Sequence, residues 1–404
     1  MTPQTLTVLS GKLQAMYGFV TAKYFEVEDF ALCILLSMIS RTNMIALGQP
    51  GIAKSAVLRE FVDMIDFSGV EGTPYFHVQM GADVSPNNVL GAPDIEYYKN
   101  HGIIRRATEG FLPDAIIAFC SEFYRVNDQV ANSGLLTILN EGEFKNGTEI
   151  RKTRLRFFMA DTNFFPKQAD DLDAEESDLR LQALHDRFLA RVLVRPLSED
   201  ENKVRMILMD DAVKPEVHLT LAELIQLQEA AQAIEIPRQV ALYMVLIANE
   251  LQSRHRIFIS PRRLKLSRNL VRAHALYQGR AKCAVEDLLA LQYAFWQKEE
   301  DIRTVRDLIF DTIGLPQADA RRYDGMRLSI LEELERNLEN HRLLPGYNPD
   351  LYYGQALKDL TALGEQLLEK YHPLSDYTAL QSVHQAIVES LRDLTVSRLI
   401  GDET

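Results

Sequence analysis

The sequence predicts an α/β core with a mainly parallel five-stranded sheet, followed by two regions that contain only helices. Apolar runs of strand length alternate with helical patterns as far as about Pro196, which is typical of parallel strands with helical connections. One run, Ala115–Cys120, has no polar alternation and indicates a strand buried on both faces. Beyond Pro196 only helical periodicities remain. We therefore expect a core at 1–198, a helical domain at 199–299 and a helical bundle at 300–404.

Local patterns predict the elements in order. Helical spacing over Leu13–Ser40, broken near Phe25–Glu26, predicts two helices, and a further helix is expected over Asn127–Leu139. Asn146–Gly147 indicates a hairpin, because both turn positions favour positive φ. The predicted strands are Asn43–Leu47, Tyr75–Met80, Ala115–Cys120, Leu155–Ala160 and Ala190–Val194.

The C-terminal region shows only helical spacing, with Leu380, Val383 and Ile387 as one example. Pro345–Gly346 and Pro373 predict breaks between its helices. A plain packing bundle and a specific partner-binding surface are both consistent with such a pattern.

Length and composition exclude several classes of protein. The 404 residues allow two or three domains, and the net charge of -13 disfavours nucleic acid as the main ligand, because phosphate backbones need basic surfaces. The longest apolar run, Phe30–Ile39, is about half of what a membrane-spanning helix needs, and no export signal is visible. Cys33, Cys120 and Cys283 stand singly in apolar stretches, which indicates buried thiols in a reducing compartment. We expect a cytoplasmic protein with no membrane span.

The main chemical signal is a glycine loop between a predicted strand and a predicted helix. A phosphate-binding loop needs inward-facing backbone N–H groups, a lysine for the β and γ phosphates, and a hydroxyl that binds Mg²⁺ directly. Lys54 and Ser55 provide the last two groups, and the following helix adds its positive N-terminal end. The predicted nucleotide-binding residues are Gly48, Gln49, Pro50, Gly51, Ile52, Ala53, Lys54 and Ser55.

Ala53 departs from the general pattern of this loop, which has glycine before the lysine. A Cβ at this position is tolerable if the residue has negative φ, as at a helix start, so we expect Ala53 to have negative φ.

The second half of such a site is an acidic group at the end of a neighbouring buried strand. Glu122 follows the third predicted strand and can activate a water molecule for attack on the γ-phosphate. The preceding position, an aspartate in ordinary enzymes with this loop, is Ser121. Its hydroxyl can accept one hydrogen bond from a metal-bound water but adds no negative charge. Asp161, at the end of the fourth predicted strand, is the alternative source of that charge.

These residues and several others give the chain a family resemblance. It resembles the MoxR branch of the AAA+ ATPases, most closely the RavA type, whose loop also carries alanine before the lysine. The resemblance covers roughly residues 10 to 298 and implies a P-loop AAA+ core with an all-α lid. RavA-type members also have a small β domain within the tail, for which this tail is too short and too helical. The matching segments are Gly48–Ser55, Gly110–Glu122, Gly134–Gly147, Leu184–Phe188, Ser260–Arg263 and Gly279–Asp287.

The resemblance implies roles for further residues. Asn163 matches the sensor that orients the attacking water, although a capping asparagine is the simpler alternative. Arg187 looks like the arginine finger that reaches a neighbouring subunit's γ-phosphate, with a salt bridge to Asp186 as the alternative. Arg262, rather than Arg263, corresponds to the lid sensor that contacts the same subunit's nucleotide.

Two segments have weaker parallels in the family. Tyr24–Val27 lies where its members line the adenine pocket, and Gly81–Gly110 resembles an insertion that faces the ring pore or a partner.

The resemblance therefore implies an ATPase, with ATP and Mg²⁺ as cofactors, that assembles as a six-membered ring. Such a ring would remodel or activate a protein client, for example a partner with a von Willebrand factor A domain. A nucleotide-switched scaffold with little or no hydrolysis is the alternative, because Ser121 is neutral. The acidic balance disfavours a third hypothesis, a nucleic-acid motor.

Overall fold

The computed structural model describes residues 2–164, 184–209, 215–341, 347–371 and 378–400. The chain divides into two compact units, which we describe separately. The first comprises Met1–Pro237, Met244–Cys283 and Asp287–Arg306, and the second comprises Arg238–Tyr243, Ala284–Glu286 and Asp307–Thr404.

A five-stranded sheet with the order β3-β4-β7-β1-β8 forms the centre of the first unit. All four neighbouring pairs are parallel. The predicted α/β fold with its parallel sheet is therefore confirmed. The strands are β1 (Met44–Leu47), β3 (Thr73–Gln79), β4 (Ala115–Ser121), β7 (Phe157–Thr162) and β8 (Ala190–Leu193).

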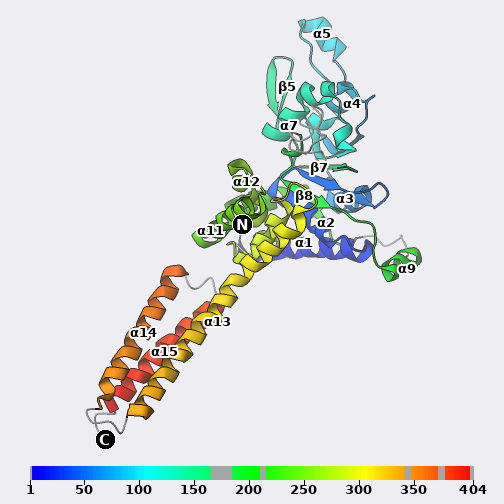
Figure 1. The fold of residues 1–404 in the computed structure, drawn as a ribbon. Helices are drawn as coiled ribbons and strands as arrows, with labels where there is room; N and C mark the ends of the chain where they lie inside the picture. The colour runs from blue at the N-terminus through cyan, green and yellow to red at the C-terminus, as the bar shows by residue number, and fades with distance from the viewer. Residues whose placement is uncertain (1, 165–183, 210–214, 342–346, 372–377, 401–404) are drawn as a thin grey trace. The chain divides into compact units, whose positions relative to one another are not determined.

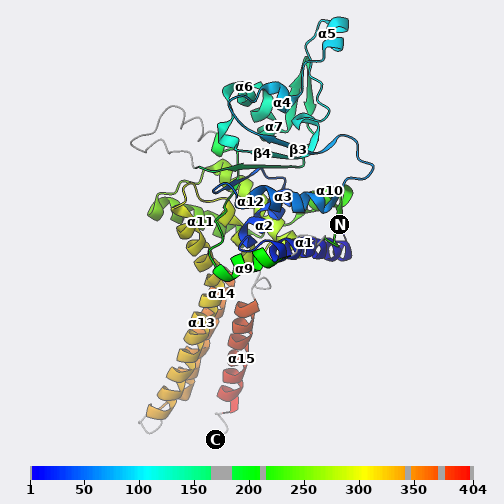
Figure 2. The same cartoon turned by 90° about the vertical axis from the view of Figure 1, so that its right-hand side faces the viewer.

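Helices cover both sides of this sheet. Figures 1 and 2 show α1, α2 and α3 on one side and α4, α6 and α7 on the other. The predicted break between the first two helices is confirmed, since Glu26 lies between them with a φ of 59°. The helices before and between the strands include α1 (Pro3–Lys23), α2 (Glu28–Ser40), α3 (Lys54–Asp63), α4 (Pro86–Leu90) and α5 (Ile95–His101).

The predicted helical segment over Asn127–Leu139 is confirmed, but it consists of three short pieces and not of one regular helix. The structure has α6 (Asp128–Val130), a π-helical turn η3 (Ala131–Leu135) and α7 (Leu136–Glu141). Gly134 interrupts the helix with a φ of 136°, and a Cβ there would lie 3.1 Å from the Phe144 ring. Close packing against the hairpin therefore selects glycine and breaks the helix.

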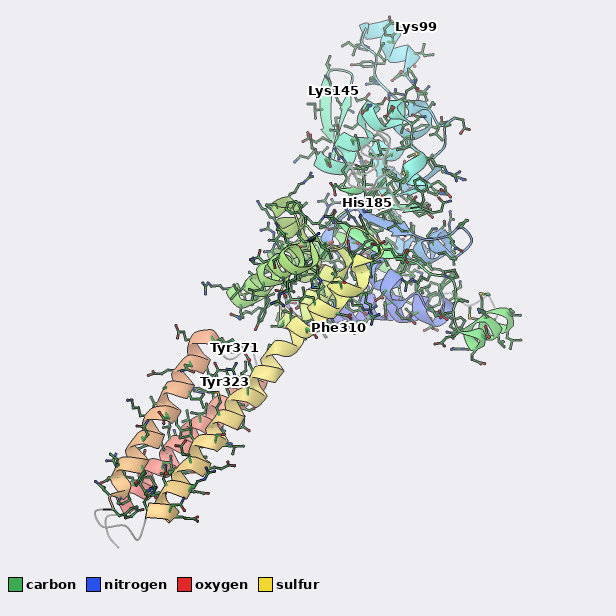
Figure 3. All side chains as sticks on the ribbon, viewed as in Figure 1. Lys99, Lys145, His185, Phe310, Tyr323 and Tyr371 are labelled. Atoms are coloured by element: carbon green, nitrogen blue, oxygen red, sulfur yellow. The ribbon has the colours of Figure 1, made fainter. Side chains whose placement is uncertain are left out.

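The predicted hairpin is confirmed as β5 (Glu143–Asn146) paired antiparallel with β6 (Glu149–Lys152). Asn146 fastens it to the preceding insertion: its Oδ1 accepts the Arg106 N–H at 2.7 Å, and its Nδ2 donates to the Arg106 carbonyl at 3.0 Å. Figure 3 shows that Lys99 on α5 and Lys145 on β5 lie far from His185, which precedes β8.

After β8 the chain is almost entirely helical, as predicted. One correction concerns β9 (Leu219–Thr220), which pairs in parallel with β2 (Ile65–Asp66). Two-residue strands are too short to produce a periodic pattern, so the sequence showed only helix here. The helices of this region are α9 (Asp200–Leu208), α10 (Leu221–Ala233), α11 (Arg238–His255), α12 (Pro261–Tyr277) and the 3₁₀-helix η4 (Val285–Tyr293).

The C-terminal helices are α13 (Asp301–His341), α14 (Pro349–Lys370) and α15 (Thr378–Ile400), which confirms the all-α region (Figure 1). Helices α14 and α15 pack against each other, with Leu360, Leu363 and Ile387 buried. The predicted breaks at Pro345–Gly346 and Pro373 lie outside the described residues. No described helix is long and apolar enough to cross a membrane.

Candidate functional site

The glycine loop lies between the end of β1 and the start of α3, at the carboxyl edge of the sheet. Gly48 anchors it, because its N–H donates to the Thr162 carbonyl of β7 at 3.1 Å. A Cβ on Gly48 would lie only 2.3 Å from the Val194 carbonyl oxygen, so no other residue fits there. Gly51 follows with a φ of 82°. The loop is therefore pinned at its base, while Gln49, Pro50 and Gly51 are exposed.

Ala53 has a φ of 60° and a ψ of 13°, so our expectation of negative φ is wrong. It occupies the left-handed region directly before the first helical residue, Lys54. This conformation costs an L-residue roughly 1–2 kcal/mol, and such strain concentrates at ligand-binding loops. The loop therefore keeps the shape that glycine normally provides, at some cost in stability.

Lys54 is buried at the centre of this edge, with a relative exposure of 7%. Its ammonium donates to the carbonyls of Gly48 and Gln49, the latter at 3.0 Å, and lies 3.8 Å from Asp161 Oδ2. Burial lowers the pKa of Lys54, an effect that the charges of Asp161 and Glu122 oppose. A phosphate group in the loop would give this desolvated ammonium a stronger partner than the carbonyls it now contacts.

Glu122 follows β4 with a φ of 54°. Its backbone N–H donates to Asp161 Oδ1 at 2.9 Å. Its carboxylate Oε2 is buried, lies 3.5 Å from Arg125 Nε, and has no hydrogen-bond partner among the described residues. A buried carboxylate oxygen without a donor is what a positioned water molecule could satisfy.

Ser121 and Asp161 end neighbouring strands but face different partners. The Ser121 hydroxyl lies 3.3 Å from His77 Nε2 of β3. Asp161, on β7, contacts both Glu122 and Lys54. Burial raises the pKa of Asp161, while the hydrogen bond from Glu122 and the charge of Lys54 oppose that shift.

Two further predicted site residues are close in sequence to Lys54 and Asp161. Ser55 is exposed in the first turn of α3, and Asn163 is half-buried directly after β7. The structure thus brings the loop, Glu122 and the end of β7 to one edge of the sheet.

A cavity of about 550 Å³ opens beside β8. Val194, whose carbonyl touches Gly48, lines it together with Glu26, Tyr293 and Trp296. Glu26 belongs to the segment expected near the adenine. Its carboxylate accepts hydrogen bonds from the backbone of Ser198 and Glu199 and from the side chains of Ser198 and Asn202. The backbone bonds dominate in lowering the pKa of Glu26 to about 2.

Arg187 is half-buried and lies in a turn, where its backbone N–H donates to the Leu184 carbonyl at 3.1 Å. Around this turn lies a cluster that the sequence did not reveal, centred on Arg191, which is fully buried. Its guanidinium donates to three backbone carbonyls, those of Phe188 at 3.2 Å, Trp296 at 2.9 Å and His185 at 3.1 Å. The one available signal was an arginine inside the apolar strand Ala190–Leu193.

Arg263, on the first turn of α12, reinforces the same turn. It donates to the carbonyls of Phe188 at 3.2 Å, Leu189 at 3.2 Å and Ala294 at 3.0 Å. Asp186 Oδ1 lies 3.4 Å from Arg191 and 3.7 Å from Arg263. These contacts fasten the start of α12 to the turn that carries Arg187.

Arg262 precedes Arg263 and is exposed. Its expected role as the lid sensor that contacts the same subunit's nucleotide stays a prediction.

Comparisons with known proteins agree with this arrangement. A family model described as the MoxR domain in the MoxR-vWA-beta-propeller ternary systems matches residues 11–229, and a model of an AAA lid domain matches residues 239–309. The chain belongs to the MoxR family of AAA+ ATPases. Its closer resemblance to the RavA type stays a prediction.

Among similar proteins, an uncharacterized protein of Methanocaldococcus jannaschii is 31% identical over 300 residues, which is 74% of each chain. A second uncharacterized protein of that organism is 28% identical over 276 residues, 68% of this chain and 69% of the relative. A structural protein of Acidianus two-tailed virus is 30% identical over 165 residues, only 24% of its own length. A crystal structure of a suggested ATPase from Cytophaga hutchinsonii has a TM-score of 0.57 at 14% identity, covers 77% of this chain and 96% of that one, and shows the fold.

Proposed function

We propose that this MoxR-family protein binds Mg-ATP in the loop Gly48–Ser55 and hydrolyses it. The observation that carries the proposal is the edge of the sheet where buried Lys54, the unsatisfied carboxylate of Glu122 and the loop meet. Mg²⁺ would bind there through the Ser55 hydroxyl and phosphate oxygens. Within the described ranges no three metal-ligating side chains gather, which suits Mg²⁺, an ion commonly held by one or two side chains and substrate phosphates.

Each residue then has a distinct role. Lys54 binds the β and γ phosphates, and Glu122 removes a proton from the attacking water, which Asn163 orients. When bound, the metal neutralises phosphate charge. The cavity beside β8 would take the adenine, since it adjoins Gly48 through Val194.

We propose that Arg187 acts on the nucleotide of a neighbouring subunit and that Arg262 contacts the nucleotide of its own subunit. Arg263 and Arg191 tie the start of α12 to the turn of Arg187, so the two outer arginines share one support. Cations delivered by a neighbour stabilise transition-state charge and make turnover depend on assembly. A ring of six subunits is the arrangement that the family resemblance favours.

We further propose that the ring remodels or activates a protein client. The description of the matching family model names a von Willebrand factor A component, which supports a partner with that domain. We also propose that the chain has three domains, with boundaries after residues 198 and 299. We propose a cytoplasmic location, because the three cysteines are free and buried and therefore fit a reducing compartment.

Phosphate release from Mg-ATP tests the activity. Glu122→Gln should abolish release and keep ATP binding, while Arg187→Ala should keep binding and remove turnover. Arg254→Ala, an exposed arginine paired with Glu250 on α11, is the matched control and should change neither. Turnover that persists in Arg187→Ala would contradict the role of that residue.

The neutral Ser121 favours a second candidate function, a scaffold switched by nucleotide binding alone. Normal ATP binding with no phosphate release at any protein concentration would select it over the ATPase.

A further inference from the structure

The position at the end of β4 that is an aspartate in ordinary P-loop enzymes is Ser121 in this chain. Ser121 ends β4, and its hydroxyl lies 3.3 Å from His77 Nε2. His77 belongs to β3, which flanks β4 on the side away from β7 and β1 in the strand order. The Ser121 hydroxyl is thus in contact with a side chain of the neighbouring strand β3.

A carboxylate is present one strand closer to that loop. Asp161 lies on β7, between β4 and β1, and is paired with Ala46 of β1 in the parallel register. Its Oδ1 accepts the Glu122 N–H at 2.9 Å, and its Oδ2 lies 3.8 Å from Lys54 Nζ. One side chain therefore contacts both the proposed catalytic carboxylate residue and the loop lysine.

The environment of Asp161 is costly for a carboxylate unless a cation is near. The residue is 7% exposed, and its strand neighbours Phe157–Ala160 are all buried and apolar. The contact with Lys54, at 3.8 Å, is longer than a direct hydrogen bond of about 2.7–3.2 Å. Lys54 is also shared with two loop carbonyls. The charge of Asp161 is therefore only partly compensated within the protein.

We propose that Asp161 supplies the negative charge toward Mg²⁺ that Ser121 lacks, by accepting hydrogen bonds from the metal's water ligands. This inference rests on the proposed function, because it concerns the same site. The acidic group has moved from the end of β4 to the end of β7, and the two positions are alternatives for one role. On this account Ser121 has no part in metal binding.

A purely structural role for Asp161 would be to accept the Glu122 N–H. Asparagine retains a side-chain carbonyl that can accept the same hydrogen bond, but it removes the charge. Asp161→Asn therefore separates the two roles, and Ser121→Ala is its matched control on the neighbouring strand.

The experiment measures the dissociation constant of a fluorescent ADP in excess EDTA and over a Mg²⁺ titration. For the wild type we expect Mg²⁺ to tighten binding. Asp161→Asn should keep its EDTA value within about threefold and lose roughly tenfold or more in apparent Mg²⁺ affinity, as expected when a group supporting a metal's ligands is removed. Ser121→Ala should behave as the wild type. A full Mg²⁺ response in Asp161→Asn, or its loss in Ser121→Ala, would overturn the proposal.

The double variant Ser121→Asp/Asp161→Asn provides a second, independent result. Restoring a carboxylate on β4 should recover the Mg²⁺ response. A double variant that unfolds at the wild-type temperature but does not recover the response would contradict the proposal that the two positions are alternatives for one role. If wild-type ADP binding were indifferent to Mg²⁺, this inference would fail while nucleotide binding stood. If the wild type bound no nucleotide even in EDTA, the proposed function itself would fail.

Discussion

Two clusters of charged residues in the same unit differ in how their charges are satisfied. The phosphate-loop cluster consists of Lys54, Glu122 and Asp161, and the arginine cluster consists of the buried Arg191, Arg263 and His185 with the exposed Asp186. In the arginine cluster each guanidinium donates to three backbone carbonyls, so both positive charges are satisfied by the protein itself, and the buried atom left without a hydrogen-bond partner in the described part of the chain is His185 Nε2 of a neutral ring. In the phosphate-loop cluster, Glu122 Oε2 has no described hydrogen-bond partner, and Lys54 and Asp161 remain 3.8 Å apart.

This difference indicates that the arginine cluster stabilises the fold, whereas the phosphate-loop cluster is suited to bind a ligand. Buried polar groups are normally satisfied, and groups left unsatisfied cluster at functional sites. The arginine cluster should therefore govern stability, while the phosphate-loop cluster should govern binding with little effect on stability. Trp296, the only tryptophan in the sequence, reports on the first unit, because its carbonyl accepts from Arg191.

The largest stability effect is expected for Arg191→Ala. The substitution removes one donor from each of the carbonyls of Phe188, His185 and Trp296 and opens a cavity, so we expect a loss of about 3–5 kcal/mol. Urea unfolding followed by Trp296 fluorescence measures it. Arg195→Ala, an exposed arginine on the same segment, should cost less than about 0.5 kcal/mol. Equal effects of the two variants would remove the distinction between the clusters.

His185 should make the arginine cluster sensitive to acid. Burial and then the charges of Arg191 and Arg263 lower the pKa of His185 well below 6.5. The folded protein therefore keeps His185 neutral, while the unfolded chain takes up a proton below about pH 6.5. This contribution is fully present above that pH and is lost as pH falls, by roughly 1 kcal/mol between pH 7.5 and 5.5.

The difference in unfolding free energy between those pH values, for wild type and His185→Gln, isolates the residue. The variant should lose this component of the pH dependence, and an unchanged pH dependence would show that His185 titrates normally.

Asp161→Asn should have the opposite pattern to Arg191→Ala, with little effect on the free energy of unfolding and a large effect on Mg²⁺-dependent binding. Burial raises the pKa of Asp161, so the folded protein disfavours its charge relative to the unfolded chain. Neutralising it should leave stability unchanged or raise it by at most about 1 kcal/mol, even as the Mg²⁺ response is lost. A destabilisation comparable to that of Arg191→Ala would place Asp161 among the structural residues.

The smallest effect is expected at Ala53. Ala53→Gly removes the cost of positive φ but adds backbone freedom to the unfolded chain, so a gain of at most about 1 kcal/mol is expected. Ala56→Gly, in the regular part of α3, should instead lose roughly 0.5–1 kcal/mol. Thermal unfolding of both variants shows whether the two signs differ as predicted.

The sequence predicted the sheet well because its strands are continuous apolar runs. The start of β7 was placed two residues early, at Leu155 instead of Phe157, and the other four strands were predicted to within about two residues. Local rules failed where a tertiary contact decided the conformation. The helix is interrupted at Gly134, where a Cβ would lie 3.1 Å from the Phe144 ring, and the loop holds Ala53 at positive φ.

The same distinction between local patterns and tertiary contacts applies to the candidate site. Lys54 and Glu122 follow recognisable local patterns, and the structure brings them to one edge. The partners of Ser121, Asp161 and Arg191 depend on which strands and helices are neighbours, which spacing along the chain does not encode.

Calorimetric titration with ATP and ADP, in the presence of EDTA and then of Mg²⁺, tests the central claim most directly. We predict saturable binding to the wild type and a loss of at least about a hundredfold in Lys54→Ala, because the buried ammonium is the loop's only described cation within reach of the phosphates. Lys12→Ala, which breaks an ion pair with Glu223 elsewhere on the unit, should bind normally. Absence of binding in folded wild type, or equal affinity in Lys54→Ala, would contradict the account.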